Sequence, residues 1–544
     1  MKNNLFKTVL VLSIIAVQFS CKNEIKNEHN AMSHNQDSII TMEELLYRPN
    51  FHFTPKENWM NDPNGMFYYN GYYHLYFQYY PDGNVWGPMH WGHAISTDMV
   101  VWKEMPIAIY PDEKGYIFSG SAVVDVNNSS GFGKGGVQPV IAMFTYHDMD
   151  AEKAGKTNYQ SQAIAYSLDE GKTFTKYAEN PVIKNPGLKD FRDPKMVWDP
   201  IDKKWALVLA AGQKIMFYSS SDLKNWTLES DFGDGVGAHG GVWECPDFFP
   251  MAVQGTDEIK WVLFVSINPG GPNGGSATQY FVGDFDGKQF RIDPSFEKDL
   301  NNAEHKSIWI DYGRDNYAGV TWANIPDTDG RKLFLGWMSN WNYGQETPTE
   351  TWRSAMTVAR TVELQKIDDS YRLLFQPVKE LANYRITKYK KESIKIDRET
   401  KLIDSKTIDL SSTEINFKIS ALKDSGFTYK LANKQGDTLA FGYNHSDKNF
   451  FVDRRKSGKT GFSEKFADRV SIAKRTSHNP DLSGTIILDK TSIELFFDHG
   501  ETVMTEIFFP NAPFETLSIE PENQEFILDN IEINGLKIPV VIQG

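Results

Sequence analysis

Three short segments place an acidic residue beside a proline, in settings that interrupt the surrounding strand pattern. They contain Asp62, Asp193 and Glu244, within Asn-Asp-Pro-Asn-Gly, Arg-Asp-Pro and Glu-Cys-Pro. A proline directly or shortly after the acid keeps the backbone extended and cannot donate to a strand ladder, so the acidic side chain is aimed away from the sheet. Glycosidic cleavage needs such rigidly held carboxylates, because one donates a proton while another meets an oxocarbenium-like centre. These acids are candidate catalytic residues.

Each acid considered alone also has a purely structural interpretation. Asp-Pro commonly opens a turn, and the adjacent Arg192 and Asp193 are able to form a local ion pair. The sequence separations are 131 residues from Asp62 to Asp193 and 51 residues from there to Glu244. The acids can meet only if the fold brings distant strands back to one point, so the elements that carry them decide their role.

Residues 48–377 are predicted to form many short strands. Apolar runs of about five to seven residues, rich in aromatic or β-branched side chains and bounded by turn residues, favour strands over helices. The clearest examples are Tyr72–Gln78, Val140–Phe144, Trp205–Leu209 and Trp261–Val265.

A weak repeat runs through the same region and predicts a propeller. Each copy is a turn with an aspartate followed by an aromatic residue, at Asp98, Asp169, Asp222 and Asp286. The intervals suit four-stranded blades with insertions, and the region has room for about five. We expect the aspartates to brace turns. Because the inner strands of successive blades face one axial funnel, the three candidate acids are able to converge there.

The composition changes after the last tryptophan. All 14 tryptophans lie between Trp59 and Trp352, and residues 378–544 are rich in Lys, Ile, Ser and Thr. Strands such as Thr485–Leu488 and a hairpin formed by Ser492–Phe497 and Val503–Phe509 predict a β-sandwich module. The expected fold is therefore all-β, a five-bladed β-propeller at 48–377 followed by a C-terminal β-sandwich at 378–544.

The amino terminus predicts export. Residues 1–21 have a basic start and an apolar run too short to span a bilayer, which is typical of an export signal. The position of Cys21 resembles the lipid-modified cysteine of bacterial lipoproteins, and the alternative is an ordinary secretory cleavage site nearby. Residues 22–47 are expected to be a flexible polar tether. An exported protein, anchored to a bacterial membrane through this lipid alone and facing the periplasm or the cell surface, is the resulting hypothesis.

Charge and cysteine content exclude several classes of function. Lys and Arg number 57 against 71 Asp and Glu, a net charge of −14, so no sequence-wide basic field attracts nucleic acid. Two cysteines, Cys21 and Cys245, cannot build a disulfide framework or a cysteine-rich zinc site. The Gly-rich run 235–240 matches a dinucleotide fingerprint by letter, but no apolar strand precedes it and no helix pattern follows. We expect no cofactor and no catalytic metal.

Taken together, the motifs resemble glycoside hydrolase family 32, the β-fructosidases that include invertases, inulinases and levanases. The resemblance covers roughly residues 48–540. Trp-Met-Asn-Asp-Pro-Asn-Gly at 59–65 is similar to the family's nucleophile motif, Arg192-Asp193-Pro194 to its transition-state stabiliser and Glu244-Cys245-Pro246 to its acid/base motif. The resemblance therefore implies Asp62 as nucleophile, Asp193 as stabiliser, held by Arg192, and Glu244 as acid/base.

Further segments resemble the family's pocket for one terminal fructosyl unit. By that resemblance eight residues are expected to contact substrate: Asn61, Gln78, Trp86, Phe118, Ser119, Arg192, Tyr317 and Trp337. Trp91 and His93, although they lie in a matching segment, are expected to be packing residues.

The resemblance implies a retaining glycoside hydrolase that releases fructose from levan, inulin, fructo-oligosaccharides or sucrose through a covalent fructosyl-enzyme. An endo-acting levanase of the same family is one alternative. The others are an inverting five-bladed glycosidase acting on arabinan or xylan, and a non-catalytic surface propeller that only binds carbohydrate. The stretch 337–355 resembles exo-acting inulinases and levanases.

Overall fold

The computed structural model describes residues 41–420, 422 and 425–539. The predicted export signal, Cys21 and the tether up to residue 40 lie outside the described residues. The last residues of the expected flexible tether are ordered, because Met42–Tyr47 form the helix α1. Tyr47 is buried against Phe509, with ring centroids 5.5 Å apart. This aromatic contact fixes the segment just before the first blade.

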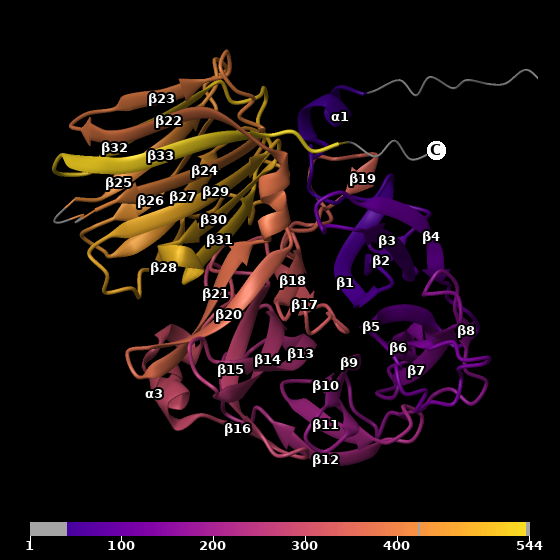
Figure 1. Ribbon diagram of the computed structural model, residues 1–544. Coiled ribbons are helices and arrows are strands. Elements are labelled where there is room, and N and C mark those ends of the chain that lie inside the picture. Colours follow the sequence, from indigo (N-terminus) through magenta and orange to yellow (C-terminus); the bar gives the residue numbers. More distant parts are fainter. Residues whose placement is uncertain (1–40, 421, 423–424, 540–544) are drawn as a thin grey trace, which may run out of the picture. The chain divides into compact units, whose positions relative to one another are not determined.

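Five antiparallel sheets follow one another along the chain (Figure 1). Their inner strands are β1 (Asn58–Tyr69), β5 (Tyr116–Val124), β9 (Phe191–Asp199), β13 (Val242–Ala252) and β17 (Tyr317–Thr321). Each inner strand contacts the next, and β17 contacts β1. The contacts close a ring, so the sheets are the five blades of a propeller, as the repeat predicted.

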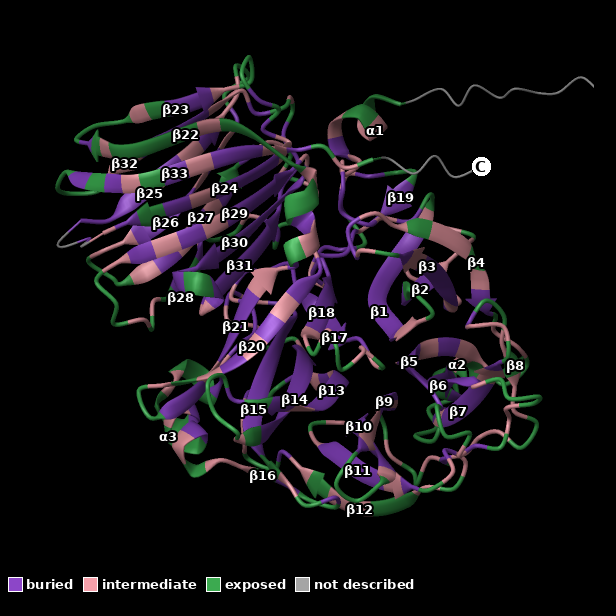
Figure 2. Cartoon of the chain, viewed as in Figure 1, coloured by how far each residue is buried: buried purple, intermediate pink, exposed green. Residues whose placement is uncertain are grey.

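In the first four blades the remaining strands follow in chain order. They are β2 (Tyr72–Tyr80), β3 (His90–Ser96) and β4 (Lys103–Ile109); β6 (Val140–His147), β7 (Gln160–Ser167) and β8 (Thr175–Lys176); β10 (Lys204–Ala211), β11 (Ile215–Ser220) and β12 (Thr227–Phe232); and β14 (Ile259–Asn268), β15 (Ala277–Phe285) and β16 (Phe290–Ile292). The strand β6 is buried along its whole length, because the faces of a blade pack against its neighbours (Figure 2).

The fifth blade contains β18 (Lys332–Trp337), β20 (Arg360–Ile367) and β21 (Ser370–Pro377) beside β17. Between β18 and β20 the chain returns to the first blade, where β19 (Trp352–Arg353) pairs in parallel with the start of β1. Asn58 lies opposite Trp352 in this pairing. The ring is therefore tied together by backbone hydrogen bonds between its first and last blades.

The four repeated aspartates brace the outer turns of the first four blades, as expected. Asp98 lies between β3 and β4, and its carboxylate accepts hydrogen bonds of 2.9 Å from the amides of Val100 and Val101. Asp222, between β11 and β12, and Asp286, between β15 and β16, accept backbone amides in the same way. These residues are scaffold.

All five inner strands carry a register shift in the same part of the ring. It falls between Met60 and Pro63 in β1, Ile117 and Gly120 in β5, Arg192 and Lys195 in β9, Glu244 and Asp247 in β13, and Tyr317 and Val320 in β17. Such bulges kink a strand and redirect its side chains. The acidic segments thus lie inside strands rather than in turns, and the bulges turn their side chains toward the axis.

The C-terminal region is a sandwich of two six-stranded sheets. One contains β22 (Arg385–Ile396), β33 (Phe526–Leu536), β24 (Ser412–Ile419), β29 (Leu482–Asp489), β30 (Ser492–Phe497) and β31 (Thr502–Ile507). The other contains β23 (Thr400–Asp404), β32 (Thr516–Pro521), β25 (Phe427–Ala432), β26 (Thr438–Asn444), β27 (Asn449–Lys456) and β28 (Ser471–Lys474). The expected hairpin is β30 and β31, joined through η3 (Asp498–Gly500).

A buried polar network joins propeller and sandwich. His52, just before the first blade, makes 2.8 Å hydrogen bonds to Asp489 and Glu494 of the sandwich. Arg360 of β20 donates to Glu494 at 2.6 Å and to Asp311 at 3.0 Å. Burial alone lowers the pKa of His52, but the two carboxylates outweigh it and raise that pKa to about 9. The network is therefore a set of paired buried charges.

Helical segments are few and short. Besides α1 and η3, they are α2 (Met149–Lys153), α3 (Pro294–Asn302), η1 (Glu304–Lys306) and η2 (Lys379–Tyr384), the last of which connects propeller to sandwich. Within residues 41–420, 422 and 425–539, no helix has the length and apolar character needed to cross a bilayer.

Candidate active site

The three candidate acids meet at the axis of the propeller. Asp62 comes from β1, Asp193 from β9 and Glu244 from β13, and the thiol of Cys245 lies between the two aspartates. Its Sγ is 3.4 Å from Asp62 Oδ2 and 3.5 Å from Asp193 Oδ2, and its backbone amide donates to Asp193 Oδ2 at 2.9 Å. Two aspartates 131 residues apart in the sequence therefore contact the same side chain.

The carboxylate of Asp62 is held on one side only. Ser119 of β5 donates a 2.8 Å hydrogen bond to Oδ2. The other oxygen, Oδ1, is buried and has no hydrogen-bond partner among the described residues. Burial raises the pKa of Asp62, and the Ser119 hydrogen bond opposes that rise. One carboxylate oxygen is thus oriented by the protein while the other is left for an incoming group.

Asp193 sits at the bulge of β9 with a left-handed backbone, φ 64°. Thr145 of β6 fixes this conformation, because the Asp193 amide donates to its Oγ1 at 3.0 Å. Burial raises the pKa of the Asp193 carboxyl to about 7, although the positive charge of Arg192 opposes the rise. An uncommon backbone conformation for a non-glycine residue is maintained where its side chain points at the axis.

Glu244 is held by two donors from other blades. Arg192 Nη2 donates to its Oε1 at 2.9 Å, and the hydroxyl of Tyr317 donates to its Oε2. Burial and the nearby Glu244 carboxyl raise the pKa of Tyr317 well above its usual range, so the phenol keeps its proton. Glu244 remains half-buried, which leaves it accessible from the mouth of the site.

Arg192 has a different partner from the one expected. Its guanidinium donates to Asp190 at 2.8 Å and to Glu244 at 2.9 Å, whereas the nearest approach to Asp193 is 3.9 Å. The bulge directs the consecutive side chains of Arg192 and Asp193 differently, so the arginine spans β9 and β13 and makes only a longer ion pair with its neighbour.

Aromatic side chains build one wall of the site. Trp337 is fully buried between Trp59 and Trp341, with ring centroids 6.1 and 5.0 Å away. Its indole Nε1 has no partner among the described residues. Trp341 is only half-buried, so it presents the more accessible ring of this group. Of the predicted contact residues, Trp337 is therefore placed behind the exposed surface.

A second pair of rings belongs to the same packed cluster as the first group. Trp86 and Phe118 are half-buried and pack edge to face, with centroids 6.0 Å apart. The same packed cluster includes Cys245 and Tyr317. The predicted contacts Trp86, Phe118 and Tyr317 are thus assembled beside the acids.

The two predicted amide contacts are braced by the protein. Trp59 Nε1 donates to Asn61 Oδ1 at 2.7 Å, and Gln78 Nε2 donates to the carbonyl of Ile117 at 3.0 Å. Both amides are buried next to the bulges of β1 and β5. Their orientation is fixed before any substrate arrives.

Three supporting residues were not predicted. Thr145 lies in a regular apolar strand, so nothing in the sequence distinguished it. Asp190 precedes Arg192 by two positions without a proline to mark it. Cys245 is distinguished in the sequence only as the neighbour of Glu244. Thr145 contacts Asp193 from another blade, and Cys245 contacts Asp62 and Asp193 across the axis, which local patterns do not report.

Family models and named relatives match most of this chain. The model of the glycosyl hydrolases family 32 N-terminal domain matches residues 52–377, and that of the family 32 C-terminal domain matches residues 380–535. A levanase from Bacillus subtilis (strain 168) is 45% identical over 493 residues, which cover 90% of this chain and 70% of the relative. The extracellular exo-inulinase inuE of Aspergillus niger is 40% identical, covering 86% and 90% of the two chains.

Solved structures give the same result. The exo-inulinase from Aspergillus awamori superimposes with a TM-score of 0.82 at 35% identity, covering 90% of this chain and 98% of the other. The β-fructofuranosidase from Schwanniomyces occidentalis in complex with fructosyl-erythritol gives 0.80 at 33% identity, covering 92% and 99%.

Proposed function

Because the chain belongs to glycosyl hydrolase family 32 and is a glycosidase acting on β-fructofuranosides, we propose that it removes terminal fructose units from fructans by a retaining mechanism. The observation that carries the proposal is the asymmetric environment of the acids. Asp62 has an oxygen without a protein partner, whereas both oxygens of Glu244 accept hydrogen bonds. Two carboxyl groups in different environments suit two different roles.

In the first step Asp62 Oδ1 attacks the anomeric carbon of the terminal fructofuranosyl unit. Glu244, in its protonated form, gives its proton to the departing glycosidic oxygen, so the bond breaks and a fructosyl ester of Asp62 forms. Asp193 accepts hydrogen bonds from sugar hydroxyls, and these strengthen as positive charge develops on the ring. The Ser119 hydrogen bond holds the nucleophile in line.

In the second step Glu244, now a carboxylate, takes a proton from water. The hydroxide equivalent attacks the same carbon, the ester bond to Asp62 breaks, and fructose leaves with its original configuration. Arg192 and Tyr317 hold Glu244 in one position through both steps, because their donors come from β9 and β17 and are fixed by the ring.

Exo action is supported by contacts between two loop segments near the acids. Two segments beside the acids are joined, because Gln345 Oε1 accepts from the Trp86 amide at 3.2 Å and the Glu350 carbonyl accepts from Asn84 at 2.7 Å. A mouth closed along this side suits the end of a chain better than its middle. Relatives named exo-inulinase support the same preference.

Levan, inulin, fructo-oligosaccharides and sucrose are the proposed substrates. Export is supported by relatives that are named as extracellular enzymes. We also propose that Cys21 carries a lipid that anchors the protein to a bacterial membrane, facing the periplasm or the cell surface.

The proposal is tested by replacing the nucleophile and identifying the products. Asp62→Asn removes the attacking charge and is expected to lower kcat on inulin and levan by at least about a thousandfold. For the unaltered enzyme we expect fructose alone by chromatography, and methyl β-fructofuranoside when methanol competes with water. Normal activity in the variant would overturn the role of Asp62, a ladder of oligosaccharides would indicate endo action, and the α-methyl product would exclude retention.

A further inference from the structure

A cavity of about 690 Å³ lies at the far end of the propeller axis, away from the three acids. It is lined by the later parts of the inner strands, including Trp198 of β9, Phe248 of β13 and Thr321 of β17. Five residues separate Asp193 from Trp198 along β9, which corresponds to roughly 15 Å of strand. Its volume falls in the range of small-molecule binding sites.

A buried ion pair separates this cavity from the catalytic end. Lys195 of β9 contacts Asp247 of β13 at 3.0 Å and donates to the carbonyl of Thr321 in β17 at 2.8 Å. The amide of Thr321 donates to the same aspartate. These contacts join three blades across the axis, so the cavity is distinct from the pocket around Asp62.

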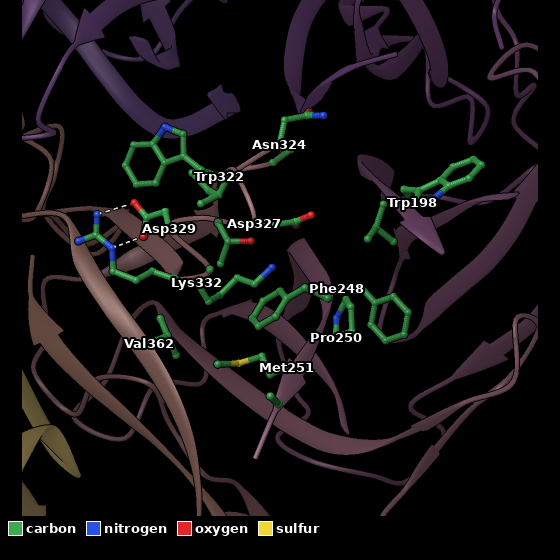
Figure 3. A pocket seen from close by; sticks show the side chains of 18 of the residues that line it. Trp198, Phe248, Pro250, Met251, Trp322, Asn324, Asp327, Asp329, Lys332 and Val362 are labelled. Carbon is green, nitrogen blue, oxygen red and sulfur yellow. Dashed lines mark hydrogen bonds and ion pairs between the residues drawn. The ribbon is translucent and has the colours of Figure 1, made fainter. Parts of the chain in front are cut away.

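Three charged side chains of the cavity have no ion-pair partner. Lys332, Asp327 and Glu363 make no ion pair within 4 Å in the part of the chain that the structure describes. Lys332 and Glu363 are half-buried, and Asp327 is exposed. The ammonium of Lys332 lies 4.7 Å above the ring of Phe249, and burial lowers its pKa to about 8. Figure 3 shows the side chains of Lys332 and Asp327 extending toward the middle of the cavity. Charged side chains without an ion-pair partner are able to exchange hydrogen bonds with a ligand.

Aromatic surface completes the lining. Trp198 is half-buried, packs edge to face on Trp205 with centroids 5.1 Å apart, and lines the cavity on the side opposite Lys332 (Figure 3). Phe248, Phe249 and Trp322 supply the apolar floor. Flat aromatic faces combined with a few polar side chains suit a sugar, because ring C–H faces stack while hydroxyls are bound at the edges.

The charges around the cavity favour an uncharged ligand. Lys195 is paired with Asp247, and Arg331 is paired with Asp329 and Glu380. Of the unpaired side chains, Lys332 is positive, and Asp327 and Glu363 are negative. No net positive field remains to select an anion, whereas one ammonium donor and two carboxylate acceptors all match the hydroxyls of a neutral polyol.

We propose that this cavity is a second, non-catalytic carbohydrate site, which binds a stretch of β-fructan chain through Lys332, Asp327 and the ring of Trp198. The identity of the polymer rests on the proposed function. A chain held at one end of the propeller keeps other chain ends near the catalytic mouth, so the site raises the effective concentration of polymeric substrate without affecting the chemistry.

The test separates polymer binding from turnover. In an Asp62→Asn background, retardation of the protein is measured in native gels that contain levan or inulin. Lys332→Met with Asp327→Ala removes the polar contacts, and Thr361→Trp places a large ring in the cavity. Each variant is expected to weaken polymer binding about tenfold. The control, Lys391→Met with Asp447→Ala on the exposed sandwich surface, is expected to leave retardation unchanged.

The same cavity substitutions in the active enzyme are expected to leave kcat/KM for sucrose within about twofold and to raise KM for polymer. Unchanged retardation in both folded variants, judged by an unaltered Tm, would overturn the proposal. Absence of fructan hydrolysis by the unaltered enzyme would instead overturn the proposed function, because retardation is measured without turnover.

Discussion

Three acidic side chains at the axis share one close cation. Among the described residues, Arg192 is the only cation that lies within 4 Å of one of these three carboxyl groups. Its shorter contact is with Glu244 rather than with either aspartate. Asp62 and Asp193 are therefore buried carboxyl groups stabilised mainly by neutral donors. Burial of these carboxylates lowers the stability of the fold, and it shifts their pKa values, as is typical of functional sites.

Asp193 is expected to make the fold less stable as pH rises. Its pKa is about 7 in the folded protein and near the ordinary value when unfolded, so the folded state binds more protons between these values. Stability therefore falls as pH rises through that window. Asp193→Asn removes this cost, so it should raise the free energy of unfolding by roughly 1–3 kcal/mol above pH 7 and by almost nothing near pH 4. Thermal denaturation at pH 4.5 and 8 checks this, and equal gains at both pH values would contradict it.

Tyr317 is expected to contribute to turnover through Glu244. Tyr317→Phe removes the hydroxyl that donates to Glu244 and keeps the ring packing. We expect kcat on sucrose to fall about 10- to 100-fold, because the acid is held less rigidly. Steady-state kinetics with a Tm measurement provide the check. The control is Tyr371→Phe in the fifth blade. It removes a hydroxyl that donates to Glu258 and should keep full activity.

At the scale of elements, the bulges of the five inner strands do the positioning. A regular strand would alternate its side chains between the two faces of the blade, and consecutive residues such as Glu244 and Cys245 would point apart. The shift in each strand lets residues from all five blades face the axis at one level. Three of the bulged positions, Asp193, Cys245 and Ala318, adopt positive φ.

The backbone at Ala318 offers a direct test of this strain. Ala318 has φ 52°, a conformation that glycine adopts more readily. Ala318→Gly is expected to cost less than about 0.5 kcal/mol or to stabilise the protein, because relief of the backbone offsets the lost methyl group. The matched control is Ala142→Gly in the regular, equally buried strand β6, with an expected loss of about 1–2 kcal/mol. Denaturant unfolding compares them, and equal losses would contradict the strain.

The prolines beside the acids predicted that the ladder is interrupted, but not how. Pro63, Pro194 and Pro246 indicated turn-like settings, whereas the segments lie inside strands as bulges. Ser119 and Tyr317 have no proline beside them, and only the family resemblance identified them as site residues. Thr145 could not be predicted at all, because its strand is regular and its role depends on Asp193 in the next blade.

For the whole molecule, the sequence predicted the two-part architecture better than its junction. The last tryptophan and the change to Lys- and Thr-rich strands indicated a second module. The buried network of His52, Arg360 and Glu494 could not be predicted, because its members are 134 to 442 positions apart and no local pattern connects them. A charged residue at such a junction is distinguishable from a surface residue only once both modules are placed.

His52 is expected to make the junction sensitive to alkaline pH. Its folded pKa of about 9 lies above the unfolded value of 6.5, so its stabilising contribution is complete below pH 6.5 and is lost as pH rises through 9. His52→Gln should lower stability by roughly 1–3 kcal/mol at pH 6 and by much less at pH 10. Tm curves of the two proteins from pH 6 to 10 should therefore converge. Parallel curves would contradict this role.

The pairing of β19 with β1 has a consequence for how the chain comes together. Asn58 obtains its partner Trp352 only after nearly three hundred further residues have left the ribosome. Until then the first blade has an open strand edge, which is a template for association with other chains. The edge of a nascent propeller at Asn58 and Trp59 is thus exposed to misassembly until the two-residue strand β19 arrives and covers it.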